Sequence, residues 1–430
     1  MNTLIKSLSI LLIYLTFTSC AELNPQQARF ISDIDFLRDT LPTKHPNLYF
    51  FLSEVDFMQQ LAEVKERVLA GASDFEVAMQ LREVTANLGD PHTNFGFYET
   101  IGKQGFFPIE IFWFADGIWI TGAAAAYPSV IGKRIVAIND VPIERVLEKI
   151  AKVVPANRPH FVHKRMHYFF VYNAILQYYG ITKDTTANFT LQGTDGREEK
   201  VTMTTVIEEY EVDSMLHLTE RPFYWQSVLS EDDTAIFRQQ YFPADSILLV
   251  QYNSCWGREL EKRFGDAEAA KNMPAFADFK KEIFANLTTY PVKKLLFDLR
   301  FNGGGSSPQG TELIKELSEL KELNQKGKLF VAISQHTFSS AVINAMNFRQ
   351  MTNAILVGAP SGGSPNHYGE VRTLVLPATK LEVYHSTDYF KFVEEEMDAV
   401  YPDVEIATNY EQIRNGIDPV YEYVRAFRLK

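Results

Sequence analysis

Residues 297–307 contain the first groups that could do chemistry, because a strand-like apolar run leads directly into Gly303, Gly304 and Gly305. Glycines tolerate positive φ angles and can leave backbone N–H groups pointing outward, a geometry that suits an anion or a developing oxyanion. A helix is expected to begin just beyond them, near Pro308. The alternative for this segment is a plain strand-to-helix turn with no chemical role.

The segment Ser334-Gln-His-Thr-Phe-Ser-Ser-Ala-Val342 carries a hydroxyl between the end of the next strand and the start of another helix. A serine at such a position is most often only a helix cap. The same position directs the hydroxyl of Ser339 toward the carboxyl ends of the strands, where open α/β sheets bind ligands. It also makes the next backbone N–H available to an oxyanion. Together with the glycine loop, this arrangement is half of an acyl-transfer site.

His92 is the third candidate, in the segment Leu88-Gly-Asp-Pro-His-Thr93. A histidine between proline and threonine is usually a turn or surface residue. Among the nine histidines, this one has Asp90 two positions before it and Thr93 directly after it. Both of those side chains could fix the tautomer of the imidazole. His92 could therefore serve as a base for the serine.

Signatures of several other chemistries are missing from the sequence. It contains no His-Glu-x-x-His zinc helix, no Gly-x-x-x-x-Gly-Lys phosphate loop, no Gly-x-Ser-x-Gly elbow and no paired cysteines, so no metal or cofactor is expected. Lys and Arg total 42 against 54 Asp and Glu, and this net charge of −12 would repel a nucleic-acid backbone. Cys255 lies in a strand-like run and is interpreted as a core residue rather than a nucleophile.

The composition supports a folded scaffold for these groups. The chain has 430 residues, 46% of them hydrophobic, which is enough for two or three domains with sizeable cores, and two cysteines exclude a disulfide framework. Apolar residues recur at helical spacing from residue 24 to about 88, with breaks expected at Pro42 and Pro46. This pattern predicts a small N-terminal helical region.

The next part of the sequence has the pattern of a small β module. Residues 106–121 and 131–140 are rich in aromatic and β-branched residues, and Asp116-Gly117 is a turn signal. A helical pattern follows over 143–150. Strand, turn, strand and helix in this order would suit a small peptide-binding module.

From Ser246 onward, strands alternate with helices at the spacing of an α/β core, in which helices cover a sheet. The predicted strands are 247–250, 294–299, 329–334 and 354–357, and the predicted helices are 276–287, 309–323 and 339–351. Residues 152–245 are mixed in pattern and receive no finer assignment.

The N-terminal residues have the pattern of an export signal. One lysine precedes an apolar run from Ser7 to Phe17 that is too short to span about 30 Å of bilayer core. Small residues then precede Cys20 in a spacing that resembles a bacterial lipobox. We expect residues 1–19 to be removed and Cys20 to be lipidated, which would anchor the protein in the bacterial cell envelope, periplasmic or associated with the outer membrane. An ordinary signal peptide cut after Ser19 is the alternative.

Together the three segments resemble the C-terminal-processing, or tail-specific, serine peptidase family, and more closely its tricorn-like branch as found in exported bacterial proteins. The similarity covers most of the chain and is weakest between residues 152 and 245. The segments that resemble family motifs are Asp298-Leu-Arg-Phe-Asn-Gly-Gly-Gly305 for the strand-to-loop motif, Thr337-Phe-Ser-Ser-Ala341 for the nucleophile turn, Gly89-Asp-Pro-His92 for the upstream histidine motif, residues 355–363 for the strand and loop that follow, and residues 401–404 and 416–419 for the closing segments.

The resemblance implies a fold and a function. The fold is a multi-domain α/β protein with a ClpP/crotonase-like α/β peptidase core over residues 216–430, an N-terminal helical region over 20–100, and a PDZ-like module with a linker over 101–215. The function is that of a serine-type endopeptidase, which hydrolyses peptide or protein substrates through an acyl-enzyme.

The nucleophile position falls on Ser339 rather than Ser340, because Ser339 lies 19 residues before Gly358. The sequence departs from the processing-protease branch at the base. That branch uses a lysine about 25 residues beyond its serine, and the corresponding residue here is Ser364, so a Ser-Lys dyad is not expected.

The tricorn-like arrangement remains available, in which His92 activates Ser339 and a downstream glutamate orients the histidine through a hydroxyl. Glu396 falls about where that branch carries its glutamate, although three consecutive glutamates are also typical of a solvated surface. His367 is a competing base if its loop folds back toward the crevice. The alternative role of His367 is that of a loop residue whose ring stacks with Tyr368.

In the implied mechanism, the N–H groups of Gly304 and Ser340 hold the oxyanion, and an extended peptide adds as a strand beside residues 131–139. The alternative class is a binding protein. The same superfamily is similar to retinoid-binding modules without proteolysis, and the 32 Phe and 20 Tyr could line an apolar pocket for a lipophilic ligand. A lipoprotein that only captures peptide ends is a further alternative.

Overall fold

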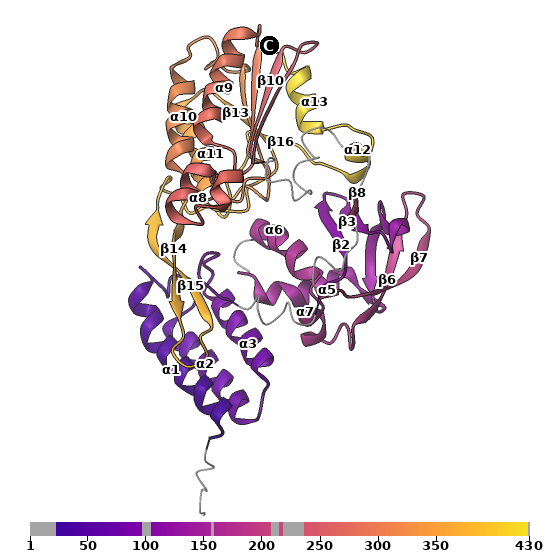
Figure 1. Ribbon diagram of the computed structural model, residues 1–430, viewed down its shortest axis with the longest axis vertical. Coiled ribbons are helices and arrows are strands. Elements are labelled where there is room, and N and C mark those ends of the chain that lie inside the picture. Colours follow the sequence, from indigo (N-terminus) through magenta and orange to yellow (C-terminus); the bar gives the residue numbers. More distant parts are fainter. Residues whose placement is uncertain (1–22, 97–104, 156–158, 208–214, 218–235, 429–430) are drawn as a thin grey trace, which may run out of the picture.

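The computed structural model describes residues 23–96, 105–155, 159–207, 215–217 and 236–428, so the predicted signal peptide and Cys20 lie outside the described residues. A helical region, an antiparallel β module and a larger sheet covered by helices follow one another along the chain (Figure 1). The predicted α/β multi-domain fold class is confirmed. Within the described ranges, no helix has both the length and the apolar character needed to cross a membrane.

The N-terminal region contains helices α1 (Pro25–Lys44), α2 (Glu54–Leu69) and α3 (Asp74–Asn87). Each follows an N-cap residue, Asn or Ser, whose side chain accepts a hydrogen bond from a backbone N–H of the first turn. Asn and Ser are the residue types that favour this position. The expected break at Pro42 is wrong, because α1 continues through it to Lys44. Pro42 lies in the last turn, where its missing N–H costs one hydrogen bond and the rest of the helix is undisturbed.

A hairpin from the C-terminal half of the chain completes the N-terminal region. Strands β14 (His367–Val375) and β15 (Glu382–Phe390) leave the core and run down beside the helices, where β15 pairs with β1 (Asn94–Phe95) (Figure 1). At the hairpin tip, the carboxylate of Asp33 in α1 accepts hydrogen bonds from the backbone N–H groups of residues 378 and 379, at 2.9 and 2.7 Å. The hairpin therefore fixes the segment that carries His92 relative to the core.

The β module is a seven-stranded antiparallel sheet in the order β2-β3-β4-β6-β7, with β5 paired to β4 and β8 paired to β3. Its strands are β2 (Ile109–Phe114), β3 (Gly117–Ala124), β4 (Arg134–Ile138), β5 (Val141–Pro142), β6 (Thr186–Gln192), β7 (Glu198–Thr204) and β8 (Met215–His217). The expectation that a peptide adds beside residues 131–139 is wrong, because β4 pairs with β6 on one edge and with β3 and β5 on the other.

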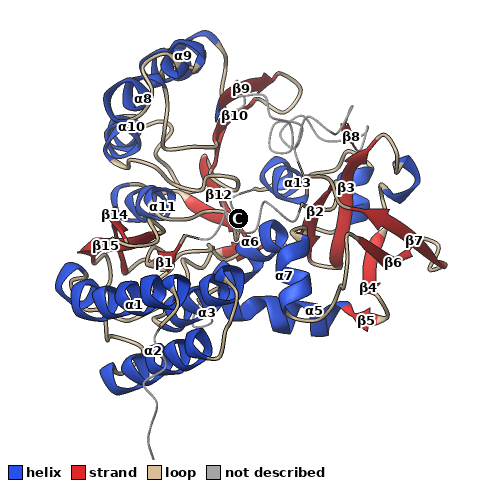
Figure 2. Cartoon of the chain, turned by 60° about the horizontal axis from the view of Figure 1, so that its bottom comes forward, coloured by secondary structure: helices blue, strands red, loops and turns tan. Residues whose placement is uncertain are grey.

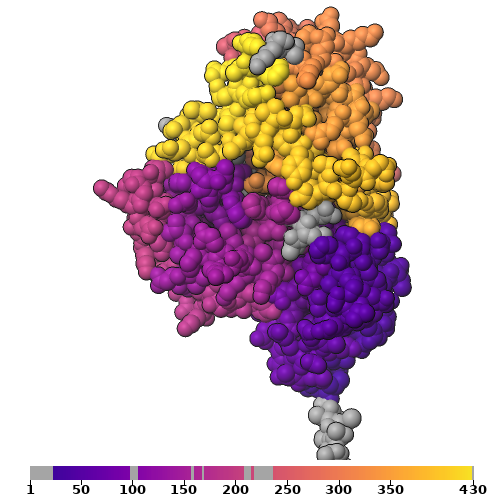
Figure 3. Space-filling view, turned by 180° about the vertical axis from the view of Figure 1, so that it is seen from behind, coloured from indigo at the N-terminus to yellow at the C-terminus, as the bar shows by residue number. Residues whose placement is uncertain are grey.

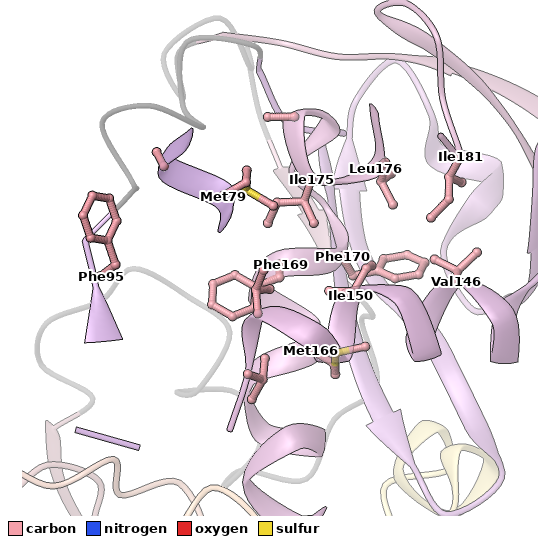
Figure 4. Close-up of a cluster of buried hydrophobic side chains, with 14 of the residues drawn as sticks. Met79, Phe95, Val146, Ile150, Met166, Phe169, Phe170, Ile175, Leu176 and Ile181 are labelled. Carbon is pink, nitrogen blue, oxygen red and sulfur yellow. The ribbon is translucent and has the colours of Figure 1, made fainter. Parts of the chain in front are cut away.

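Three helices of the module pack toward the N-terminal region. These are α5 (Ile143–Ile150), α6 (Pro159–Phe170) and α7 (Asn173–Tyr178), and α5 has the predicted bounds. Their apolar side chains meet those of α3 in one cluster, which includes Met79, Val146, Ile150, Met166, Phe169, Phe170, Ile175 and Leu176 (Figure 4). The C-terminal half of α6 is thus anchored in a core.

The core sheet has the order β16-β13-β12-β11-β10-β9, and its strands are parallel except for β9. The strands are β9 (Phe237–Phe242), β10 (Ile247–Tyr252), β11 (Lys294–Asp298), β12 (Leu329–Ile333), β13 (Ile355–Gly358) and β16 (Val404–Glu405). Every predicted strand and helix of this part is present. The largest difference is at α10, which ends at Glu319 rather than near Leu323.

Both faces of this sheet are covered, which explains why its strands have nearly continuous apolar sequences. On one face pack α9 (Phe276–Thr289), α10 (Pro308–Glu319) and α11 (Ser340–Met351), whereas α8 (Arg258–Phe264) has no buried residue. On the other face pack α13 (Pro419–Ala426), α12 (Tyr410–Arg414) and the β module (Figure 2). Trp119 of the module stacks on Tyr410 with ring centroids 4.1 Å apart.

The C-terminal part of the chain joins all three regions. In the space-filling view from behind, its residues lie against both the β module and the N-terminal helices (Figure 3). One direct link is the backbone hydrogen bond from Ala115 of the module to Thr408, at 3.0 Å. The site residues predicted from separate segments therefore belong to parts of the molecule that are in mutual contact.

Candidate active site

The glycine loop and the serine turn lie at the carboxyl ends of neighbouring strands. Strands β11 and β12 are parallel, and Asp298 pairs in register with Ala332. The glycine loop follows β11, and the turn with Ser339 follows β12, so both reach the same edge of the sheet. This is the edge at which open α/β sheets bind ligands, as the sequence predicts.

A buried ion-pair cluster holds the start of the glycine loop. The guanidinium of Arg300 donates to the carboxylate of Asp298 at 2.7 to 3.2 Å and to that of Asp418 at 2.6 and 2.9 Å. Burial alone would lower the pKa of Arg300, but the two carboxylates outweigh it and raise that pKa. Asp418 also caps α13 by accepting the N–H of Val420 at 2.8 Å. The closing segment around Asp418 therefore anchors the loop, since each buried charge has partners.

The turn that carries Ser339 has a strained backbone. Ser339 has φ 52° and ψ −124°, although serine has a Cβ that disfavours positive φ. Hydrogen bonds to the glycine loop hold the turn: the N–H of Phe338 donates to the carbonyl of Asn302 at 3.0 Å, and the hydroxyl of Ser340 donates to the carbonyl of Gly305 at 2.8 Å. Such strain is characteristic of a side chain that the fold presents for function.

Gly304 allows the closest approach of the two loops. Its φ is +112°, and a Cβ added there would lie 2.8 Å from the Cβ of Ser339. Glycine is therefore required at this position, but for a reason other than the predicted one. Its N–H donates to the side-chain oxygen of Asn302 at 2.9 Å and is not available to a substrate oxyanion.

The amides that remain for an oxyanion belong to Ser340 and Gly303. Within the described part of the chain, neither backbone N–H has a hydrogen-bond acceptor. Ser340 is the first residue of α11, where the N–H groups of a helix have no partner within it and the helix dipole favours negative charge. The prediction for Ser340 is thus compatible with the geometry, and Gly303 replaces Gly304 as the second candidate.

His92 and Ser339 are in hydrogen-bond contact although 247 positions separate them. His92 Nε2 lies 3.1 Å from Ser339 Oγ. The backbone N–H of His92 donates to Asp90 at 3.0 Å, and its ring stacks on that of Phe338 with centroids 4.8 Å apart. The imidazole is therefore held on both its backbone side and its ring face, with its side chain 10% exposed.

The surroundings of His92 keep its imidazole neutral. Burial is the main cause, and it lowers the pKa to about 4 despite the opposing effect of the Asp90 charge. The positive charges of Lys164 and Arg165 and the neighbouring His367 lower it further. A neutral imidazole whose proton is on Nδ1 can accept the hydroxyl proton of Ser339 at Nε2.

Asp90 is the acid nearest to the second ring nitrogen. Its Oδ1 lies 3.9 Å from His92 Nδ1, and Nδ1 has no hydrogen-bond partner among the described residues. A shift of about 1 Å would bring the two atoms to hydrogen-bond distance. This geometry favours the tautomer that activation of Ser339 requires.

Asp90 is fixed by residues from three segments. Its Oδ2 accepts hydrogen bonds from Thr93 and Ser386, both at 2.6 Å, and contacts His45 Nε2 at 3.1 Å. Burial would raise the pKa of Asp90, but the hydrogen bond from His45, the charge of His92 and the two hydroxyls outweigh it and lower the pKa. Asp90 is therefore a carboxylate, and its position depends on the hairpin that supplies Ser386.

The structure does not bring Glu396 to His92. Glu396 is exposed, and its carboxylate accepts hydrogen bonds from Asn366 at 3.2 Å and from Tyr389 at 3.0 Å. His367 does lie near the site, with its ring centroid 6.0 Å from that of His92. Its Nδ1, however, contacts the carbonyl of Ser364 at 2.9 Å, and its hydrogen bonds include none to Ser339.

Cys255 is a core residue, as predicted. It is completely buried, its Sγ lies 3.5 Å from the side-chain oxygens of Asn302 and Asn344, and burial raises its pKa to about 12. Among the residues that the structure describes, no group of three His, Cys, Asp or Glu side chains could hold a metal ion.

Sequence reasoning missed His45, Ser386 and Lys164. His45 and Ser386 matter only through Asp90, and no short-range signal connects them to it. Lys164 lies in the mixed region, 7% exposed and 4.3 Å from the centroid of the Phe338 ring. Only the packing of α6 shows that this lysine reaches the site.

No protein-family model and no curated protein sequence matches the chain. Among solved structures it is similar to mature CPAF complexed with lactacystin, with a TM-score of 0.64 at 11% identity, over 93% of this chain and 97% of that one. It is also similar to mature CPAF, with a TM-score of 0.63 at 12% identity, over 93% of this chain and 96% of that one. The chain therefore shares its overall fold with CPAF.

Proposed function

We propose that this protein is a serine-type endopeptidase of the C-terminal-processing family, in its tricorn-like branch, with Ser339 as nucleophile and His92 as base. The observation that carries the proposal is the 3.1 Å contact between His92 Nε2 and Ser339 Oγ, beside the N–H of Ser340, which has no acceptor among the described residues. The family motifs of the sequence and the fold shared with CPAF support it. The PDZ-like character of the β module is part of the proposal.

The proposed reaction begins when Ser339 Oγ bonds to the carbonyl carbon of the substrate and His92 Nε2 takes the hydroxyl proton. The carbonyl oxygen becomes an oxyanion that accepts hydrogen bonds from the N–H groups of Ser340 and Gly303. Each such donor contributes about 3 kcal/mol in enzymes of this kind. His92 then gives its proton to the amine nitrogen as the C–N bond breaks, which leaves an acyl ester on Ser339.

Hydrolysis of the ester completes the cycle. A water gives one proton to His92 Nε2 while its oxygen bonds to the ester carbon, and the tetrahedral intermediate breaks down to release a carboxylic acid. Ser339 Oγ leaves and recovers a proton from His92. During both steps Asp90, rather than Glu396, stabilises the imidazolium, because it is the carboxylate beside His92 Nδ1.

Binding of a lipophilic ligand is less well supported. The apolar cavity between the β module and the core has a volume of about 230 Å³ and is lined by residues that include Trp113 and Phe301. This is smaller than the roughly 300–1,000 Å³ of most small-molecule sites. A larger cavity of about 1010 Å³ lies at the opposite edge of the sheet and is lined by many charged side chains, including Lys294 and Arg428.

The proposal is tested by incubating the purified protein with denatured casein and identifying the products by mass spectrometry. We expect peptides with new termini that are absent when Ser339→Ala replaces the wild type. Intact casein after long incubation, together with a lipophilic compound that co-purifies with the protein, would instead favour the binding protein.

The lowered pKa of His92 predicts an unusual pH profile. Because the base must be neutral, kcat/KM should fall with decreasing pH only as the pH passes through about 4. We expect constant kcat/KM from about pH 5.5 to 7, where an unperturbed histidine with a pKa of about 6.5 would lose much of its activity. Initial rates from pH 3.5 to 8, with circular dichroism at each pH to verify folding, measure this profile. An acid limb centred near 6.5 would contradict the assignment of the base.

Export and lipidation at Cys20 are also part of the proposal and rest on the lipobox-like sequence. Expressed in a bacterial host with radioactive palmitate, the wild type should carry the label and sediment with the envelope. The variant Cys20→Ala should do neither. Equal labelling of the two proteins would refute the anchor and leave the peptidase proposal intact.

A further inference from the structure

His45 is a second histidine beside the carboxylate of Asp90. It follows α1 directly, and its side chain is completely buried. Its Nε2 lies 3.1 Å from Asp90 Oδ2, whereas the Nδ1 of His92 lies 3.9 Å from Asp90 Oδ1. The carboxylate of Asp90 therefore has an imidazole beside each of its two oxygens.

The backbone after α1 fixes the tautomer of His45. The backbone N–H of Asn47 donates to His45 Nδ1 at 3.1 Å, so this nitrogen has a lone pair and carries no proton. The ring proton is then on Nε2, which donates it to Asp90 Oδ2. His92 needs the opposite tautomer, because its Nε2 must accept the proton of Ser339. The two histidines therefore have different functions at one carboxylate.

Neighbouring groups hold the ring of His45 in one orientation. The ring of Tyr368 is tilted against it with centroids 4.7 Å apart, and the ring of Phe50 lies parallel to it with centroids 6.5 Å apart. The backbone N–H of His45 donates to the carbonyl of Leu41 at 3.1 Å, which ties the residue to α1. Because the ring is buried and hydrogen-bonded at both nitrogens, Nε2 cannot turn away from Asp90 without loss of these contacts.

The hydrogen bonds of Asp90 are divided unequally between its two oxygens. Oδ2 accepts from His45, Thr93 and Ser386, whereas Oδ1 accepts the backbone N–H of His92. A carboxylate oxygen accepts about two hydrogen bonds. The remaining acceptor capacity of Asp90 therefore lies on Oδ1, which faces His92 Nδ1. The donors to Oδ2 determine which oxygen has that place.

His45 differs from the other two donors to Oδ2. Burial raises the pKa of Asp90, and the hydrogen bond from His45 is the largest of the effects that lower it. The hydroxyls of Thr93 and Ser386 can rotate, whereas the direction of a ring N–H is fixed by the ring. His45 is therefore the donor whose loss should disturb both the charge and the orientation of Asp90 most.

We propose that His45 is a positioning residue of the active site, whose Nε2–H holds Asp90 with its Oδ1 toward His92. This inference rests on the proposed peptidase function and makes catalysis depend on the end of α1. His45 gives up no proton during the reaction. The proton of Ser339 moves to His92 Nε2 and then to the leaving amine, while the His45 N–H stays on the carboxylate.

Steady-state kinetics of His45→Phe and His45→Gln with a casein-derived peptide test the proposal. Phenylalanine keeps an aromatic ring but has no donor, so kcat should fall about 10- to 100-fold, as expected for one hydrogen bond to a charged group, and KM should change little. Glutamine can place an N–H near the position of Nε2, and its kcat should stay within about fivefold of the wild type.

The pH profile of His45→Phe separates positioning from a loss of packing. Asp90 must be ionised to stabilise the imidazolium, and the variant lacks the hydrogen bond that most lowers the pKa of Asp90. The acid limb of kcat/KM should therefore lie at higher pH than in the wild type. An unchanged acid limb together with unchanged kcat in the folded variant would overturn the proposal.

Chemical rescue of His45→Ala is a second test, which does not need the phenylalanine variant to fold. The substitution removes a buried ring, and buried cavities of this kind bind small ring compounds. Imidazole at millimolar concentration should restore kcat at least about fivefold, because its N–H replaces that of His45. N-methylimidazole has no N–H when neutral and should restore nothing. Equal rescue by the two compounds would contradict the role of the N–H.

The matched control is His385→Phe, which replaces another buried histidine with the same ring. His385 is 5% exposed, and its Nδ1 contacts the carbonyl of Ser386 at 3.3 Å rather than the carboxylate of Asp90. Its kcat should stay within about threefold of the wild type. A loss as large as that of His45→Phe would mean that any change of packing in this neighbourhood lowers activity, and would overturn the proposal.

The tautomer of His45 can be measured without activity and keeps this inference distinct from the peptidase proposal. In protein labelled with ¹⁵N-histidine, two-bond ¹H–¹⁵N spectra should show the proton of His45 on Nε2, in the wild type and in Ser339→Ala. A proton on Nδ1 would overturn the inference whatever the activity. This tautomer in a protein that cleaves no casein would remove the enzyme and keep the His45–Asp90 contact. Cleavage that is indifferent to His45→Phe would do the opposite.

Discussion

Replacing Ser339 with Ala should lower kcat/KM for peptide hydrolysis by about 10⁴- to 10⁶-fold, which is the loss seen when a catalytic serine is removed from enzymes of this kind. The hydroxyl is the only group within hydrogen-bond distance of the His92 imidazole that could form an acyl-enzyme, among the contacts the structure describes. The fold should be unaffected, because alanine keeps the Cβ and the backbone of the turn is held by its neighbours. Steady-state hydrolysis of a casein-derived peptide measures the effect.

Three further variants make this prediction specific. His92→Ala should cost about as much as Ser339→Ala, and the double variant should cost no more than either, because the two residues act as one unit. Ser340→Ala removes the neighbouring hydroxyl, which donates to the carbonyl of Gly305, but keeps the backbone N–H. It should retain activity within about tenfold. Additive losses for Ser339 and His92 would mean that they do not act together.

Replacing Asp90 with Asn should lower kcat/KM by about 10²- to 10⁴-fold, the second largest effect we expect. The change removes the negative charge that lies 3.9 Å from His92 Nδ1 and that favours its protonated, cationic form. Substrate binding should change little, so the loss should fall on kcat rather than on KM. Initial-rate kinetics over a range of substrate concentrations separate these two quantities.

The matched control for Asp90→Asn is Ser386→Ala, which removes one hydrogen bond to the same carboxylate and keeps its charge. Its free energy of unfolding should fall by about 1–3 kcal/mol, as for the loss of one buried hydrogen bond. Its kcat/KM should fall much less than that of Asp90→Asn. Glu396→Gln should leave activity within about threefold, because the exposed Glu396 contacts Asn366 and Tyr389 and not the histidine. A large loss in Glu396→Gln with none in Asp90→Asn would restore the glutamate to the role that the sequence resemblance implies.

The sequence was sufficient to predict Ser339 and His92, the pair of residues at the centre of the site, because each lies in a family motif. It carries no direct information on the distance between them. Ser339 and the glycine loop follow neighbouring parallel strands, and the loops that follow such strands lie at the same edge of the sheet. His92 is different. Nothing between residues 92 and 339 indicates their contact, and only the family resemblance of Gly89-Asp-Pro-His92 connected them.

The sequence indicated that Asp90 could fix the tautomer of His92, but it could not show, for a physical reason, that Asp90 rather than Glu396 is the third residue of the site. Asp90 becomes the orienting acid only because β15 brings Ser386 to its carboxylate and α1 ends with His45 beside it. The hairpin that does this has several exposed residues in the middle of β14, and its partner β1 is two residues long and more than 270 positions away. Alternation of apolar and polar residues carries no information on such a partner.

The role of Gly304 illustrates a similar limit. Three consecutive glycines indicate free amides, but the pattern does not say which N–H remains free after folding. Asn302 takes the N–H of Gly304, and the approach of Ser339 requires the glycine for space. The α/β core, in contrast, was well predicted, since strands buried on both faces have apolar runs that need no partner to be identified.

The most direct test of the central claim is to locate the covalent adduct of a fluorophosphonate probe. After brief incubation of the wild type near pH 7, intact-mass measurement and peptide mapping should find one adduct, on the Oγ of Ser339. The rate of labelling should fall by orders of magnitude in His92→Ala and remain near that of the wild type in Glu396→Gln. An adduct on any other residue, or labelling of Ser339 at the same rate without His92, would contradict the account.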